Sequence, residues 1–185
     1  MTWKLWSAAF ALAAVGLGAP RAARADIAAV DVEGHAGVTS GPGTGSPAEN
    51  MGGIGFGLGA RLLIFEGYYD YTNFGSGAAI SRAIGGLRAG IGAGDIRLVL
   101  RVGGGLIRES GGALSGDSLG LGTNTGAVGR IGAALETRVA PACLIGLGID
   151  GETFVLSGPS RPGNDGLYTG SDVFGNLHVM FELGI

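Results

Sequence analysis

The sequence is poor in charged residues and in cysteine, and each shortage excludes a class of protein. Charged residues make up 15% of the 185 residues, whereas soluble domains average about 25%. The chain therefore has too few charged residues to cover an ordinary water-exposed surface. The single cysteine, Cys143, excludes an intrachain disulfide. Beyond the N-terminal segment no apolar run approaches the roughly 18 residues of a membrane-spanning helix.

Glycine and apolar residues are abundant instead. The chain has 40 glycines, 46% hydrophobic residues and a mean hydropathy of +0.39. Because the glycines do not repeat as Gly-X-Y, collagen is excluded, and the apolar content is too high for a disordered chain. The length is that of one domain.

The N-terminus has the three parts of a secretory signal peptide. Residues 1–4 end in Lys4, the chain's only lysine; residues 5–17 are apolar; and Ala23-Arg24-Ala25 is a small-residue cleavage site. We therefore predict a signal peptide over residues 1–25 and a mature domain over residues 26–185. That domain has nine arginines, no lysine and 15 acidic residues, a net charge of 9 − 15 = −6. Such a charge excludes the basic surface of nucleic-acid-binding proteins.

Apolar and polar residues alternate with a period of two over eight segments. The pattern is clear from Ile96 to Leu106, where the even positions are apolar or glycine and the odd ones include Arg97 and Arg101. A period of two is typical of β-strands with two different faces. The predicted strands are residues 28–38, 53–62, 66–72, 82–91, 96–106, 127–136, 143–152 and 173–185.

The connections between these segments alternate in length. Long polar links are expected at residues 39–50, 73–80, 108–125 and 156–171, and short ones near residues 64–65, 92–95 and 139–142. Long loops at one end and tight turns at the other are typical of outer-membrane barrels, whose long loops are extracellular and whose turns are periplasmic. The pattern predicts an all-β fold, an eight-stranded antiparallel up-and-down transmembrane barrel.

Alternation alone leaves two arrangements open. A soluble, lipocalin-like periplasmic barrel would hold its apolar face inside around a ligand, whereas a membrane barrel turns that face to lipid. The missing lysine, the dilution of the charged face by glycine and the unbroken apolar face favour the membrane barrel. The lipid of an outer membrane is then the expected environment of the outer wall.

In the membrane arrangement, charges of both signs point into a narrow lumen. The small residues Gly53, Gly55, Gly57 and Gly59 leave room there for arginine side chains. Buried charges must be paired, so we predict a lumen closed by salt bridges. Its polar network is expected to comprise Asp31, Glu33, His35, Arg61, Glu66, Asp70, Arg88, Arg97, Arg101, Arg130, Glu136, Asp150, Glu152, His178 and Glu182.

In pattern and layout the mature chain resembles the OmpA/OmpX-like group of small eight-stranded outer-membrane barrels. The resemblance implies a Gram-negative source. It also implies recognition by the outer-membrane assembly machinery through the terminal strand, with Phe181, Leu183 and Ile185 as the signal. Members of the group commonly end in Phe, whereas this chain ends in Ile185. The expected role is structural or surface-interacting, with an unknown partner at the loops and neither enzymatic activity nor a cofactor.

Three alternatives to this role stay open: a narrow porin-like channel, a lipid-modifying barrel enzyme and the soluble ligand-binding barrel. His35 and His178 are candidate proton carriers. Barrel-shaped lipid A deacylases, however, use an outward-facing His and Ser, and His178 projects inward by parity. Loop residues, among them Asn124 and Asp172, could bind a cation, but their types are those of ordinary solvated turns, which we favour, and no metal site is predicted. Aromatic girdles are expected at both membrane surfaces, formed by Tyr69, Tyr71, Phe74, Phe154, Tyr168, Phe65 and Phe181.

Overall fold

The computed structural model describes residues 28–40, 50–74, 78–93, 95–111, 123–157 and 166–183. No helix among these residues is long and apolar enough to cross a membrane. They form eight strands: β1 (Ala28–Ser40), β2 (Asn50–Leu62), β3 (Phe65–Asn73), β4 (Ala79–Ala93), β5 (Ile96–Ser110), β6 (Thr123–Ala140), β7 (Cys143–Ser157) and β8 (Leu167–Leu183).

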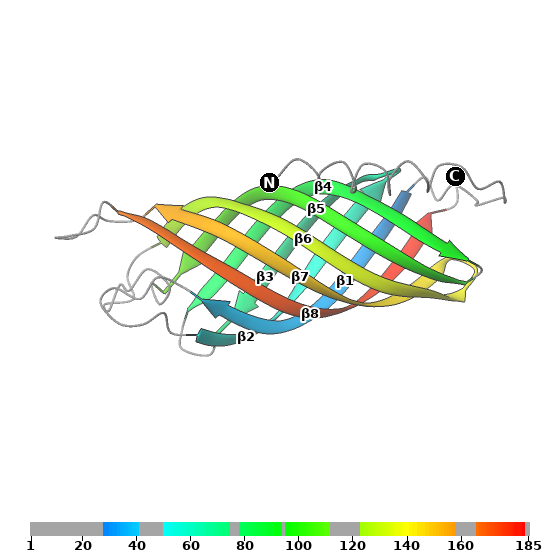
Figure 1. The fold of residues 1–185 in the computed structure, drawn as a ribbon, viewed down its shortest axis with the longest axis horizontal. Helices are drawn as coiled ribbons and strands as arrows, with labels where there is room; N and C mark the ends of the chain where they lie inside the picture. The colour runs from blue at the N-terminus through cyan, green and yellow to red at the C-terminus, as the bar shows by residue number, and fades with distance from the viewer. Residues whose placement is uncertain are drawn as a thin grey trace, which may run out of the picture.

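Each strand pairs antiparallel with its neighbour in sequence, and β8 pairs with β1 to close the barrel (Figure 1). Cα partners followed once around the barrel from Ala28 return to β1 at Val38, a stagger of 38 − 28 = 10 residues. Stagger and strand tilt are linked in a barrel, so the strands run obliquely (Figure 1). Residues distant in sequence therefore meet at one height in the lumen.

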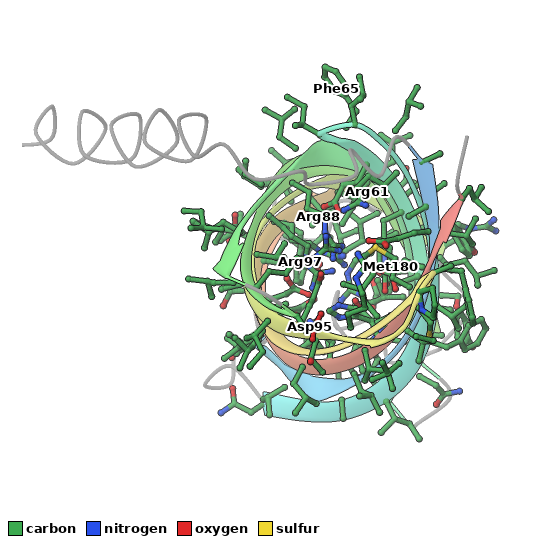
Figure 2. The ribbon with its side chains drawn as sticks, turned by 90° about the vertical axis from the view of Figure 1, so that its right-hand side faces the viewer. Arg61, Phe65, Arg88, Asp95, Arg97 and Met180 are labelled. Carbon is green, nitrogen blue, oxygen red and sulfur yellow. The ribbon has the colours of Figure 1, made fainter. Side chains whose placement is uncertain are left out.

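The predicted alternation of faces is confirmed on all eight strands. Large apolar side chains point outward, with exposed fractions of 71% for Ile54, 71% for Leu106 and 70% for Ile131. In Figure 2, which looks into the end of the barrel, Phe65 points away from the wall whereas Arg61, Arg88, Arg97 and Met180 point into the lumen. The outer wall thus carries an apolar belt, the surface that a bilayer requires.

The short connections are two-residue turns, as between Leu62 and Phe65. This turn lacks Gly, Pro and Asn, and Leu63 adopts a left-handed φ of 57°, which disfavours a residue with a Cβ. The turn begins one residue before its predicted position. Its exposed apolar residues continue the belt to the end of the barrel.

Several strands extend beyond their predicted limits toward the long loops. Strand β6 begins at Thr123 and β8 at Leu167, so Asn124 and Asp172 are buried strand residues. Their interpretation as solvated loop residues was wrong. The other loop residues considered for a cation, Asp117, Asn164 and Asp165, lie outside the described part of the chain.

The lumen changes character along its length. Near the long loops it contains an apolar cluster of buried residues, comprising Phe74, Ala78, Ile80, Ile84, Ile107, Val128, Phe154, Leu156 and Tyr168. Phe74, Phe154 and Tyr168 are therefore inside the barrel, and their predicted place in an outward girdle was wrong. Of the predicted girdle residues, Tyr69, Phe65 and Phe181 are exposed on the outer wall.

Candidate functional site: the charged lumen

Next to the apolar cluster, on its side toward the short turns, Arg82 from β4 joins three acidic side chains from three other strands. Its Nη1 lies 2.7 Å from Oδ1 of Asp70, and its Nε lies 2.7 Å from Oε2 of Glu152. Its Nη2 donates to Asp172, and its Nη1 also donates to Thr72 Oγ1 at 2.9 Å. The Arg82 side chain has no exposed surface. One cation thus links β3, β7 and β8 to β4.

Arg130 from β6 binds two of the same carboxylates. Its Nη2 lies 2.6 Å from Oδ2 of Asp70, and its Nε lies 2.5 Å from Oε1 of Glu152. Its guanidinium also stacks over the ring of Tyr68 at 4.7 Å. Two arginines and three acids therefore form one charged layer across the barrel.

A second layer lies closer to the periplasmic turns. Arg101 from β5 pairs with Asp150 at 2.6 Å and with Glu33 at 3.2 Å. Asn176 donates through its Nδ2 to Oδ2 of Asp150 at 2.7 Å, and its Oδ1 accepts from His178 Nδ1 at 3.4 Å. This layer connects β1, β5, β7 and β8.

A third layer lies at the periplasmic end around Glu136 from β6. Glu136 pairs with Arg88, with Arg97 at 2.5 Å and with His178 Nε2 at 3.0 Å. Arg97 also reaches Glu182 at 3.6 Å, and Arg138 from the rim pairs with the other oxygen of Glu182 at 2.6 Å.

Arg88 completes this layer on its opposite side. It lies 3.5 Å from Asp31 and 3.7 Å from Glu66. A cavity of about 10 Å³ beside these three residues has room for roughly one water molecule. The three layers thus place paired charged side chains across the lumen at three levels.

The predicted lumen residues all face the lumen, and 14 of the 15 lie within ion-pair distance of a partner of opposite type there. The exception is Arg61, which has no ion pair among the described residues, although it points into the lumen (Figure 2). The prediction omitted Arg82, Asp172, Glu109, Asn124 and Asn176, which are buried inside. Arg82 lies an even number of residues before Arg88 on the same strand, so the alternation of faces already placed its side chain inward.

The lumen contains an arrangement that superficially resembles a catalytic triad. His35 Nε2 lies 2.8 Å from Thr72 Oγ1, and His35 Nδ1 lies 3.7 Å from Glu33. All three residues are buried, and Phe174 packs against the imidazole with ring centroids 5.3 Å apart. Both histidines of the chain face the lumen. Among the described residues no group of His, Cys, Asp and Glu could hold a metal ion.

Comparison with known proteins shows similarity of fold. No protein-family model and no curated protein matches the chain. Neisserial surface protein A matches with a TM-score of 0.59 and 12% identity over 84% of this chain and 99% of that chain. The outer-membrane enzyme PagL matches with a TM-score of 0.46, 18% identity and coverages of 79% and 97%. Ail of Yersinia pestis matches with a TM-score of 0.36, 13% identity and coverages of 82% and 98%. The chain therefore has the fold of the small eight-stranded outer-membrane β-barrels.

Proposed function

We propose that this protein is a closed outer-membrane barrel with a structural or surface-interaction role. The observation that carries the proposal is the filled lumen: three charged layers and an apolar cluster follow one another along the barrel. Side chains that occupy the lumen in this way would leave no open route for a solute. What remains available for function is the outer wall and the extracellular end.

The main test is conductance in planar lipid bilayers. Reconstituted protein is expected to give no current above background, because the arginine and carboxylate side chains fill the barrel cross-section. Stepwise conductance from the pure protein would support the rival narrow channel and contradict the closed barrel. Absence of the heat-modifiable gel shift would show instead that the sample had not folded.

A lipid-modifying enzyme is the second candidate. The mass of lipid A is expected to stay unchanged when the protein is expressed, because both histidines are enclosed in the lumen. A mass change that His178→Ala abolishes would overturn the non-enzymatic assignment.

Cell fractionation tests the soluble alternative. Burial of charge inside and exposure of large apolar residues outside oppose a lipocalin-like barrel with an apolar interior. We expect the protein in the outer-membrane fraction, and recovery from the soluble periplasm would contradict the proposal.

Export and assembly form part of the same proposal. Removal of residues 1–25 would leave a mature chain that begins at Asp26, which mass spectrometry of the purified protein would reveal. Phe181 and Leu183 both face outward with 49% exposure, as recognition of this strand by the assembly machinery requires, and Ile185 lies outside the described residues. Replacing Phe181 and Leu183 with Ser is expected to reduce the folded fraction in cells.

A further inference from the structure

Arg108 on β5 stands apart from the other arginines of the barrel. Among the described strand residues it is the only charged residue on the outward face, where its side chain is exposed. No ion pair or hydrogen bond of its side chain occurs among the described residues. A charge is costly at the middle of a bilayer but costs only about 0–1 kcal/mol near its surface. The cost of Arg108 on the outer wall therefore depends on how deep in the bilayer this residue lies.

Arg108 lies where the apolar belt ends. Leu106, two residues below it on the same face, is 71% exposed. Its cross-strand partners are Ser81 on β4 and Thr125 on β6, and Ser110 follows it toward the loops. Because the belt is apolar and this row carries hydroxyls, Arg108 lies at the level of the lipid headgroups on the extracellular side.

A groove opens on the outer wall beside this row. It has a volume of about 810 Å³, and the outward residues Ala127, Gly129, Thr153, Val155 and Ser171 line it across β6, β7 and β8. Ala127 is the diagonal neighbour of Arg108 through Thr125, and such neighbours lie about 7–8 Å apart. An arginine side chain spans that distance. The charge and the groove can therefore contact one molecule.

We propose that Arg108 and this groove bind lipopolysaccharide of the outer leaflet, with a lipid A phosphate on Arg108 and an acyl chain against Ala127 and Gly129. A guanidinium matches a phosphate in charge and in its bidentate geometry. Hydroxyls of Ser81, Thr125, Thr153 and Ser171 surround the site, and they suit a sugar headgroup, whereas a phospholipid offers fewer hydroxyl partners. The proposal rests on the outer-membrane placement proposed above.

The test measures binding of diphosphoryl lipid A to the folded full-length mature chain in detergent micelles by native mass spectrometry. Phosphatidylglycerol is the second probe. Arg108→Gln is expected to weaken lipid A binding about tenfold, since a hydrogen-bonded charge contributes about 1.5–3 kcal/mol. Arg108→Lys should retain most of the binding because it keeps the positive charge. Unchanged lipid A binding by Arg108→Gln would overturn the proposal. So would a phosphatidylglycerol affinity equal to that for lipid A, if Arg108→Gln weakened the binding of both lipids to the same extent.

A second pair of variants tests the groove. A Cβ added at Gly129 meets only Thr153 Oγ1, at 3.9 Å, and one added at Gly67 on β3 meets nothing within 4 Å. Gly129→Leu therefore fills the groove without an internal clash, and Gly67→Leu is the matched control on another part of the wall. Gly129→Leu should weaken lipid A binding several-fold while Gly67→Leu leaves it unchanged. Equal binding by both variants would overturn the groove as the acyl-chain site.

Fractionation and heat-modifiability of the same variants separate two kinds of failure. If wild-type protein does not fractionate with the outer membrane, the proposed placement fails and the lipid site fails with it. If Arg108→Gln fractionates and folds normally yet binds lipid A like wild type, only the lipid site is overturned.

Discussion

The two ends of the lumen use opposite chemistry on the same alternating backbone. Toward the periplasmic turns the inward residues are arginines and acids and the outer wall is apolar. Toward the long loops most inward residues are apolar, among them Phe154, Leu156 and Tyr168, and Asn124 donates to the buried Glu109 there, while the outward positions become polar. These polar outward positions are Asn50, Asn73, Ser110, Thr123, Thr125, Ser157, Thr169 and Ser171.

The difference follows from the solvent outside the wall. Where lipid surrounds the barrel, apolar residues belong outside and the narrow lumen must pair its charges. Where water surrounds the barrel, the apolar residues move inside and pack as in a soluble protein. In the proposed outer-membrane placement, the switch between the two marks the outer surface of the bilayer, and Arg108 lies at that boundary.

The charged section is expected to be most sensitive to loss of Arg82. Arg82→Met removes the partner of Asp172 and one of the two arginine partners of Asp70 and Glu152. Three buried acids then share Arg130 alone, and uncompensated buried charge costs about 3–5 kcal/mol. Urea unfolding of the barrel in lipid vesicles measures this loss. Arg108→Gln, which changes an outward arginine on the neighbouring strand, is the control and should change stability by less than about 1 kcal/mol. Equal losses would mean that the charged layer does not hold the barrel together.

In the apolar section Phe154→Ala is expected to cost about 3 kcal/mol, because Phe154 is 2% exposed and its removal leaves a cavity. The same vesicle assay measures it. The control is Phe65→Ala on the outer wall, where the side chain is 60% exposed and lipid refills the space, so the loss should be smaller. A larger loss for Phe65 would contradict a soluble-like core at the loop end.

The comparison also explains which features were predictable. Period-two alternation predicted eight strands and their faces because a large apolar residue seldom occupies the lumen in the lipid-embedded section. At the loop end that rule reverses. Residues 167–172 place Tyr168 inside and Thr169 and Ser171 outside, so the first residues of β8 were interpreted as a loop and Asp172 was missed.

Pairing within the lumen was not predictable in the same way. Parity places Arg82 inward, but its partners come from β3, β7 and β8. The partners depend on the ten-residue stagger of the closed barrel, which the alternating pattern does not encode. The aromatic residues show the same limit, since Phe154 and Tyr168 resemble girdle residues by type and by distance from the strand ends, although their parity is inward.

Glycine substitutions on the inner and outer faces of the wall are expected to differ in their effect on stability, by less than the substitutions of Arg82 and Phe154. A Cβ added at inward Gly105 would lie 1.9 Å from the backbone oxygen of Ala83, whereas one added at outward Gly85 meets nothing within 4 Å. Gly105→Ala is therefore expected to destabilise the barrel by about 2 kcal/mol through overpacking. Gly85→Ala should be neutral or slightly stabilising because it reduces the entropy of the unfolded chain. Vesicle unfolding of both variants checks this, and similar values for the two would remove the steric explanation.

Arg61 is expected to give the smallest effect and tests whether an inward position alone makes an arginine important. It lies in the lumen beside Arg88 (Figure 2) but has no ion pair among the described residues. Arg61→Gln should therefore change the unfolding free energy by no more than about 0.5 kcal/mol, the range of substitutions that break no specific contact. A loss near that of Arg82→Met would show that the positive charge of Arg61 stabilises the lumen at a distance, through the field that it exerts on the acidic residues. A negligible loss would show that stability depends on direct pairs such as Arg82 with Asp70.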